Sequence, residues 1–426
     1  MNKYMTFDRR DLLKSAVFVG AGLAFPRVAF GDISKFDPNP KALENFFVLV
    51  RISPEGGGLD VTLGLDPWVK PQRPLETDIF LEYKDEDITR AGNLNLGPAA
   101  KPLALYANDL LVLNGVFISN SDNGHSAALF YQTTGNGQGH SADLPVELEV
   151  ARGSSPYGIL VGSNRSLNTG VRRVAYVRGS DVLSARKDGD PTAALERAVK
   201  DARTPLERAI RDVVGSKETT LKLRQELSDF EKAGATLKDA HVIAAGFLSG
   251  AAAHAQLDLQ TQTNLDTHSN HEKEHLKGQL DAWTQLADVF SIFKSLPYGT
   301  KGESLFDRTT FMVVSDFSRT PALNASKGKD HNPLLTSILF AGYGLQKNKT
   351  INESLLIEAA RSKTGASYHM ASPFDYATGL PARSRQGASF IYPENVIASV
   401  GRAMGVDPSK LGSVPANTPV IPGFAL

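Results

Sequence analysis

Residues 309–331, TTFMVVSDFSRTPALNASKGKDH, decide how the rest of the chain is organised. They begin with an apolar, β-branched run at 310–314, which predicts a buried strand. The polar residues that follow this strand are Ser315, Asp316, Arg319, Asp330 and His331. In an open α/β sheet, ligands bind outside the carboxyl ends of the strands. The stretch therefore predicts an α/β fold with a functional site where this strand ends.

Three further apolar runs predict strands at 46–52, 110–116 and 334–341. The first, FFVLVRI, has no alternation of polar and apolar residues, which is typical of a parallel strand buried on both faces. It leads into a Gly-rich turn with Asp60, and the second run leads into a polar loop and a helix start with His125 and Ser126. Free main-chain N–H groups at the start of a helix favour the binding of an oxyanion or phosphate group. His125 and Ser126 are therefore candidates for a ligand and a nucleophile, or for helix caps.

Two regions have a helical pattern. Residues 271–296 place apolar side chains in one stripe, and Pro297 ends the predicted helix. Residues 188–250 keep a helical period with many charged residues, which predicts a helical insertion or cap on the α/β core. The predicted fold is one α/β domain over residues 32–426, with a central, mostly parallel sheet flanked by helices.

Residues 265–275, LDTHSNHEKEH, precede the predicted long helix and concentrate carboxylates and imidazoles. Such side chains bind hard or borderline divalent cations. Two ions held a few ångström apart by Asp and His can activate a nucleophile and stabilise a phosphoryl or sulfuryl transition state. Arg319 would add a planar donor for phosphate or sulfate oxygens. The candidate ligands from the two stretches are Asp266, His268, His271, Asp316, Asp330 and His331.

His271 and His275 also match the His-Glu-x-x-His spacing of a metalloprotease helix. That motif needs a buried helix with an apolar lead-in, whereas this one starts a helix among Ser269, Asn270 and Lys273. We interpret the match as a coincidence, and a protease would require Glu272 to face a cleft.

The composition excludes several classes of protein and of functional site. Lys and Arg together number 46, as do Asp and Glu, so no basic excess suggests a nucleic-acid partner. Apolar residues make up 41% of the chain, as in an ordinary globular protein. The chain has no cysteine, which excludes disulfides, thiolate zinc sites and cysteine nucleophiles.

The N-terminus predicts export. Arg9-Arg10 precede a short apolar run at 15–25 and a small-x-small cleavage candidate at 29–31. This run is too short for a stable membrane span. The paired arginines resemble a twin-arginine export signal over residues 1–31, with an ordinary secretory signal or an uncleaved anchor as the alternatives. The expected location is periplasmic or secreted, and the twin-arginine translocase is the expected partner during export.

The motifs LDTHSNH, FMVVSDFSRTPALN and GKDHNPLLTSILFAGYGL resemble those of a bacterial family of exported proteins of unknown function, related to sulfatases and alkaline phosphatases. The resemblance covers about residues 46–345 and implies an alkaline-phosphatase-like fold. It implies metal-site roles for Asp60, His125, Asp266, His268, Asp316 and His331.

The sequence departs from the family pattern at several positions. Asp316 replaces the usual Glu, Ser318 the usual Gly, and Asn332 the Gly after Asp-His, while the loop around His125 is reordered. Ser126 is the predicted nucleophile. A formylglycine sulfatase is disfavoured, because the chain has no cysteine to modify and no serine in the matching Ser-x-Pro-x-Arg setting.

The sequence therefore predicts an exported hydrolase of phosphate or sulfate esters that uses zinc, calcium or manganese. Ser126 and Arg319 are its catalytic candidates. Its substrate would be a small-molecule or polymer ester. The alternative is a non-catalytic binding or scaffold protein of the cell envelope that keeps the fold.

Overall fold

The computed structural model describes residues 45–54, 56–68, 80–119, 124–153, 217–298, 302–361, 367–382 and 388–426, with short stretches at 155, 158–162, 167–172, 174, 176–180 and 182–183. The predicted export signal at 1–31 lies outside the described residues, as does the 188–216 part of the predicted helical insertion.

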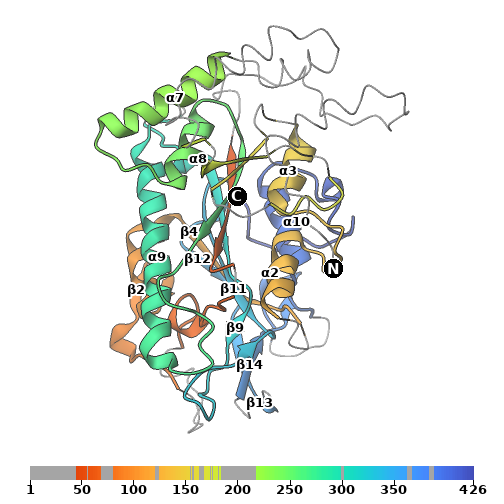
Figure 1. Ribbon diagram of the computed structural model, residues 1–426. Coiled ribbons are helices and arrows are strands. Elements are labelled where there is room, and N and C mark those ends of the chain that lie inside the picture. Colours follow the sequence, from red (N-terminus) through yellow and green to blue (C-terminus); the bar gives the residue numbers. More distant parts are fainter. Residues whose placement is uncertain are drawn as a thin grey trace, which may run out of the picture.

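An eight-stranded sheet forms the centre of the molecule (Figure 1). In spatial order its strands are β12 (Lys349–Ile351), β4 (Leu110–Val116), β11 (Thr336–Gly342), β8 (Thr309–Val314), β1 (Phe46–Ile52), β7 (His254–Leu259), β5 (Ile159–Val161) and β6 (Tyr176–Arg178). Neighbours are parallel except where β11 pairs with β4 and β8. The predicted α/β class with a mostly parallel sheet is confirmed.

β1 shows why the predicted central strands are mostly apolar. It pairs with β7 on one side and β8 on the other, and all seven of its residues are buried. Phe46 belongs to one core cluster and stacks on Phe247 at a ring distance of 4.6 Å, whereas Phe47 belongs to a second cluster. Successive side chains of a strand point to opposite faces, so both faces of this sheet are covered.

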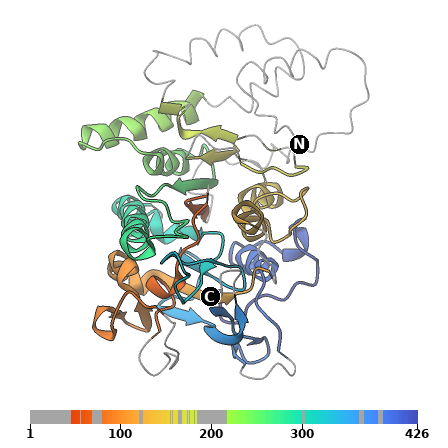
Figure 2. The same ribbon diagram turned by 60° about the horizontal axis from the view of Figure 1, so that its bottom comes forward.

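Helices cover the two faces of the sheet (Figures 1 and 2). The first face packs against α8 (Asp239–Leu248) and α9 (His271–Ser295). The second packs against α2 (His125–Thr134), α3 (Leu144–Arg152) and α10 (Pro393–Ala403). Within the predicted insertion, α8 is part of the main core, while α7 (Lys217–Lys232) packs on α8 through a small cluster of its own.

The shorter elements complete the chain. The 3-10 helices are η3 (Val61–Leu63), η5 (Asp85–Asp87), η6 (Pro98–Asp109), η7 (Phe306–Arg308) and η8 (Pro408–Lys410). The small strand pairs are β2 (Thr89–Ala91) with β3 (Leu94–Leu96), β9 (Ser318–Arg319) with β10 (His331–Asn332), β13 (Ser354–Arg361) with β14 (Ser367–Ala371), and β15 (Phe374–Asp375) with β16 (Leu380–Pro381).

The direction of β11 determines where the site forms. The parallel strands β4, β7 and β8 all end at the same edge of the sheet. β11 runs in the opposite direction and therefore starts at that edge. The segment that leads into β11, which includes β10, lies at the same edge. This edge faces the lower end of the molecule in Figure 1, near β9 and β14.

Candidate metal centre

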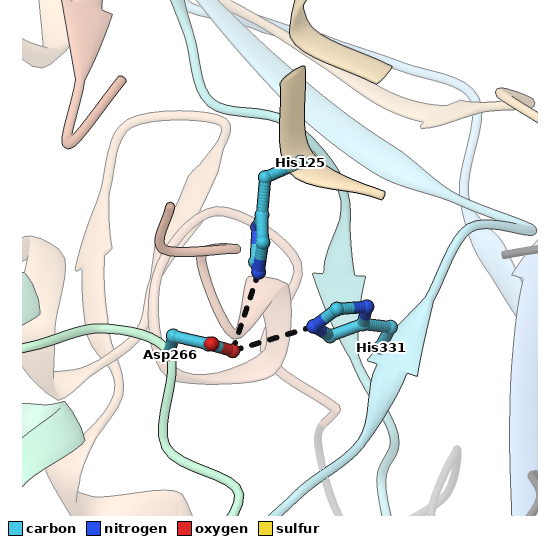
Figure 3. Close-up of side chains that lie close together, drawn as sticks. All are labelled: His125, Asp266 and His331. Atoms are coloured by element: carbon cyan, nitrogen blue, oxygen red, sulfur yellow. Dashed lines mark hydrogen bonds and ion pairs between the residues drawn. The ribbon is translucent and has the colours of Figure 1, made fainter. Parts of the chain in front are cut away.

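Three chain segments bring imidazoles and a carboxylate together at this edge of the sheet. His125 is the first residue of α2, in the connection after β4. Asp266 and His268 lie in the loop between β7 and α9, and His331 lies in β10. Figure 3 shows His125 and His331 both pointing at Asp266.

One oxygen of Asp266 is the focus of this cluster. Its Oδ1 lies 3.3 Å from Nε2 of His125, 3.3 Å from Nε2 of His331 and 3.1 Å from Nε2 of His268. The ligand atoms of His125, Asp266 and His331 all lie within 4.8 Å of one another. The side chains of His268 and Asp266 keep 47% and 32% of their surface exposed, so an ion can reach them from solvent. The arrangement is suitable for one divalent cation.

Asp316 and Asp330 lie on the far side of these imidazoles, away from Asp266. Oδ2 of Asp316 contacts Nδ1 of His125, and Oδ1 of Asp330 lies 3.6 Å from Nδ1 of His268. Both carboxylates were predicted as metal ligands. In the structure they instead face the ring nitrogens opposite the shared centre. A carboxylate in that position fixes the tautomer and orientation of a metal-binding histidine.

Arg319 is also placed differently from the prediction. Its side chain is fully buried, and Nη2 donates to Oδ1 of Asp266 at 2.7 Å. Nε and Nη1 donate to the main-chain oxygens of Gly58 and Lys329, each at 3.4 Å. With these donors used inside the protein, Arg319 holds Asp266 in place and does not face solvent as a donor for substrate oxygens.

The charges of the cluster depend on one another. Hydrogen bonds from His125 and His331, with the charge of Arg319, hold the pKa of Asp266 well below its usual range. Burial alone lowers the pKa of His125, but its hydrogen bonds to Asp266 and Asp316 outweigh burial and raise that pKa to about 9. The carboxylates of Asp266 and Asp316 therefore favour the protonated, positively charged form of His125.

Asp60 and His271, both predicted as ligands, belong to a separate and fully buried group. Oδ2 of Asp60 lies 2.5 Å from Nζ of Lys329 and 3.4 Å from Nε2 of His271. Its Oδ1 accepts from the main chain and the hydroxyl of Thr62, at 3.0 and 2.7 Å. Burial by itself would raise the pKa of Asp60, but the charge of Lys329 together with the interactions of His271 and His275 outweighs burial and holds that pKa well below its ordinary value. The cation that the structure places beside Asp60 is therefore an ammonium group of the chain itself, and the metal-binding role of Asp60 stays a prediction.

The protease interpretation finds no support in the long helix. His271 and His275 are buried and stack on each other at a ring distance of 4.3 Å, whereas Glu272 between them is exposed. Ser126 is exposed in the first turn of α2, next to His125. Its role as nucleophile stays a prediction, and the preceding residues 120–123 lie outside the described part of the chain.

Three residues near the cluster were not identified from the sequence: Glu82, Thr267 and Lys329. Thr267 and Lys329 lie within the two quoted stretches, but a threonine and a lysine are not typical metal ligands. The signal that the sequence offered for these two residues was their position next to predicted ligands. Glu82 lies outside every motif, and nothing in the sequence points to it.

Comparisons with known proteins place the chain in a family. Residues 112–371, more than half of the chain, match the family described as "Protein of unknown function (DUF1501)", and the chain belongs to it. Among solved structures, the lipoteichoic acid synthase LtaP from Listeria monocytogenes is similar over 92% of this chain and 79% of that chain, with 9% sequence identity and a TM-score of 0.36. No curated protein matches the chain. Within the described residues, none of the helices combines the length and the apolar character needed to cross a membrane.

Proposed function

We propose that the chain is an exported, metal-dependent hydrolase of phosphate or sulfate esters, acting in the periplasm or outside the cell. The observation that supports this most is the gathering of three imidazole Nε2 atoms around Oδ1 of Asp266, at a partly exposed site. The resemblance of the sequence motifs to the sulfatase and alkaline phosphatase relatives supports the ester chemistry. The paired arginines at positions 9 and 10 support export through the twin-arginine translocase.

The donor set indicates which ion would bind. Imidazole nitrogens suit zinc and related transition ions, whereas calcium prefers oxygen ligands throughout. His125, His268, His331 and Asp266 would hold one such ion. We therefore favour zinc or manganese over calcium, at one ion per chain.

A bound divalent ion supplies a Lewis acid and lowers the pKa of a coordinated water. The residues of the chain would do the rest. Asp316 and Asp330 would keep the two imidazoles in the binding tautomer, and Arg319 would hold Asp266. Ser126 is the candidate nucleophile and would displace the alcohol from phosphorus or sulfur, after which water would release the phosphate or sulfate. Attack by water without a covalent intermediate gives the same products.

Elemental analysis combined with an ester screen tests the proposal. Purified wild-type protein should contain about one equivalent of zinc or manganese and should cleave nitrophenyl phosphate, bis(nitrophenyl) phosphate or nitrophenyl sulfate. Asp266→Asn and His331→Gln should lose both properties, while His140→Gln, at an exposed histidine outside the cluster, should keep them. Metal uptake without any hydrolysis would favour the binding or scaffold alternative. Absence of metal from a folded wild-type protein would refute the centre.

A further inference from the structure

Thr267 connects the candidate metal centre to the buried histidines of α9. It lies between Asp266 and His268, and it is only 3% exposed. Its Oγ1 is 2.7 Å from Nδ1 of His271 and 2.9 Å from Nδ1 of His275. The hydroxyl therefore lies between two stacked imidazoles, while the residues on either side of Thr267 supply the centre.

The hydroxyl of Thr267 joins the two rings by hydrogen bonds. It has one hydrogen and can donate to only one of the two Nδ1 atoms, so the other Nδ1 carries a hydrogen and donates to Oγ1. The far nitrogens of both rings face Asp60. Nε2 of His275 lies 3.0 Å from the main-chain nitrogen of Asp60 and 3.1 Å from Oε1 of Gln279, which also accepts from that N–H. Nε2 of His271 lies 3.4 Å from Oδ2 of Asp60.

The main chain of Thr267 is fixed as well. Its carbonyl oxygen accepts from the N–H of Lys329 at 3.0 Å, and Lys329 binds Asp60 through its side chain. Asp60 is also the residue that the far nitrogens of His271 and His275 face. The segment with Asp266 and His268 is therefore held by its middle residue, through both the side chain and the main chain.

We propose that Thr267 is a positioning residue, whose hydroxyl, held between His271 and His275, sets the geometry with which Asp266 and His268 bind the metal ion. This inference rests on the metal centre of the proposed function. It also gives the two histidines of the long helix a role: they orient the metal-binding segment and bind no metal themselves. Loss of an outer partner of a metal ligand typically weakens metal binding by about ten- to a hundredfold.

The test compares Zn²⁺ and Co²⁺ binding by ion-free full-length protein with that of two variants. Thr267→Val keeps the shape of the side chain but leaves both Nδ1 atoms without their partner. It should weaken binding by about ten- to a hundredfold and change the visible spectrum of the bound Co²⁺. Thr267→Ser keeps the hydroxyl and should have the metal affinity and the Co²⁺ spectrum of the wild type. Thr310→Val is the matched control, because it removes a buried hydroxyl that donates to the main chain of Tyr343 at the other end of β8.

A second measurement does not depend on the metal. Hydrogen exchange of ion-free protein should be faster over residues 265–271 and at the amide of Lys329 in Thr267→Val, and unchanged in Thr267→Ser. Wild-type affinity and an unchanged Co²⁺ spectrum in Thr267→Val would overturn the inference while leaving the metal centre intact. Failure of the wild-type protein to bind either ion would overturn the centre itself, and this inference with it.

Discussion

Nδ1 of His125 contacts Oδ2 of Asp316, while Nε2 of the same ring lies 3.3 Å from Oδ1 of Asp266. The main-chain N–H of Gly57 also points at Nδ1 as a donor, at 3.3 Å, but the contact with the carboxylate of Asp316 is shorter. We therefore assign a hydrogen to Nδ1. Once His125 loses its second proton, its Nε2 lone pair points at the candidate centre. Asp316 thus orients the ring of His125, while a different carboxylate, that of Asp266, is a candidate ligand of the same ion.

Replacing Asp316 should weaken metal binding without abolishing it. Asp316→Ala removes the acceptor of Nδ1, and the expected loss of affinity for Zn²⁺ is about ten- to a hundredfold. Asp316→Asn should lose less, because its amide oxygen still accepts a hydrogen bond. Competition with a chromogenic chelator measures both affinities. Asp229→Asn, on exposed α7, is the control, and equal affinity of Asp316→Ala and wild type would contradict the assignment.

Metal binding should strengthen as the pH rises. The pKa of His125 is raised to about 9 in the ion-free protein, so below that pH the ion must displace a proton. Release of one proton changes the apparent affinity by about tenfold per pH unit, which gives about a hundredfold between about pH 6 and about pH 8. Calorimetry in buffers of different ionisation enthalpy counts the protons released. A flat profile over this range would show that His125 stays outside the coordination sphere.

The central strands could be predicted from the sequence because they are buried on both faces. β1 and β8 are mostly apolar runs without polar alternation, and the structure places them side by side in the sheet. The antiparallel direction of β11 could not be predicted, since an apolar run has the same composition in either direction. Yet this direction brings His331 to the edge where His125 and Asp266 lie. The hairpin of β13 and β14 was not predicted either.

The candidate site could be predicted only in part, because residue type identifies metal-binding chemistry but not the partners that a side chain meets in the fold. Residue types with metal-binding chemistry identified His125, Asp266, His268 and His331. Residue type could not separate these from Asp60, because only the fold shows that a lysine 269 positions away binds its carboxylate. A buried lysine is unusual unless it is paired, and its partner is known only once the chain has folded.

The pair of Asp60 and Lys329 should behave as one unit in stability measurements. Both side chains are fully buried, 2.5 Å apart. Asp60→Asn or Lys329→Met alone leaves one charge buried without its partner, at a cost of about 3–5 kcal/mol. The double variant should lose clearly less than the sum of the two single losses. Chemical denaturation of the four proteins gives this coupling, and additive losses would show that the pair is not coupled.

The buried carboxyl group of Glu82 should make the folded protein less stable as the pH rises towards neutrality. Its side chain is 6% exposed, 3.9 Å from Nε2 of His271, and its carboxylate has no hydrogen-bond partner among the described residues. Burial, reinforced by the charges of Asp60 and Glu272, raises its pKa to about 7 although Lys329 opposes this. The unfolded chain releases this proton at a lower pH, so wild type loses stability between about pH 4.5 and about pH 7. The loss is of the order of 3 kcal/mol.

Glu82→Gln has no proton to lose and should not show that decline. Denaturation midpoints at about pH 4.5 and about pH 7.5 should therefore diverge, with the variant relatively more stable at the higher pH. Parallel curves for the two proteins would mean that a partner or a cation satisfies the Glu82 carboxylate. Addition of Zn²⁺ in a further series would separate these two explanations, because an ion at Glu82 would stabilise only the wild type.

Gly328 should be needed for the geometry of the centre because no side chain fits there. A Cβ atom on Gly328 would lie 1.9 Å from the main-chain carbon of His268 and 2.0 Å from its oxygen. The turn at 324–328 is itself fixed, since the N–H of Gly328 donates to Oδ1 of Asn324 at 3.0 Å. Gly328→Ala must therefore displace the segment that positions Asp266 and His268. We expect weaker Zn²⁺ binding together with a lower melting temperature.

Gly139→Ala provides the comparison, because a Cβ atom there meets nothing within 4 Å. It should leave both the affinity for Zn²⁺ and the melting temperature close to those of the wild type. If Gly328→Ala lost stability but kept the wild-type affinity, the displaced segment would not be the one that holds the ion. Because Asp266 contacts every histidine of the cluster, that result would count against the centre as a whole.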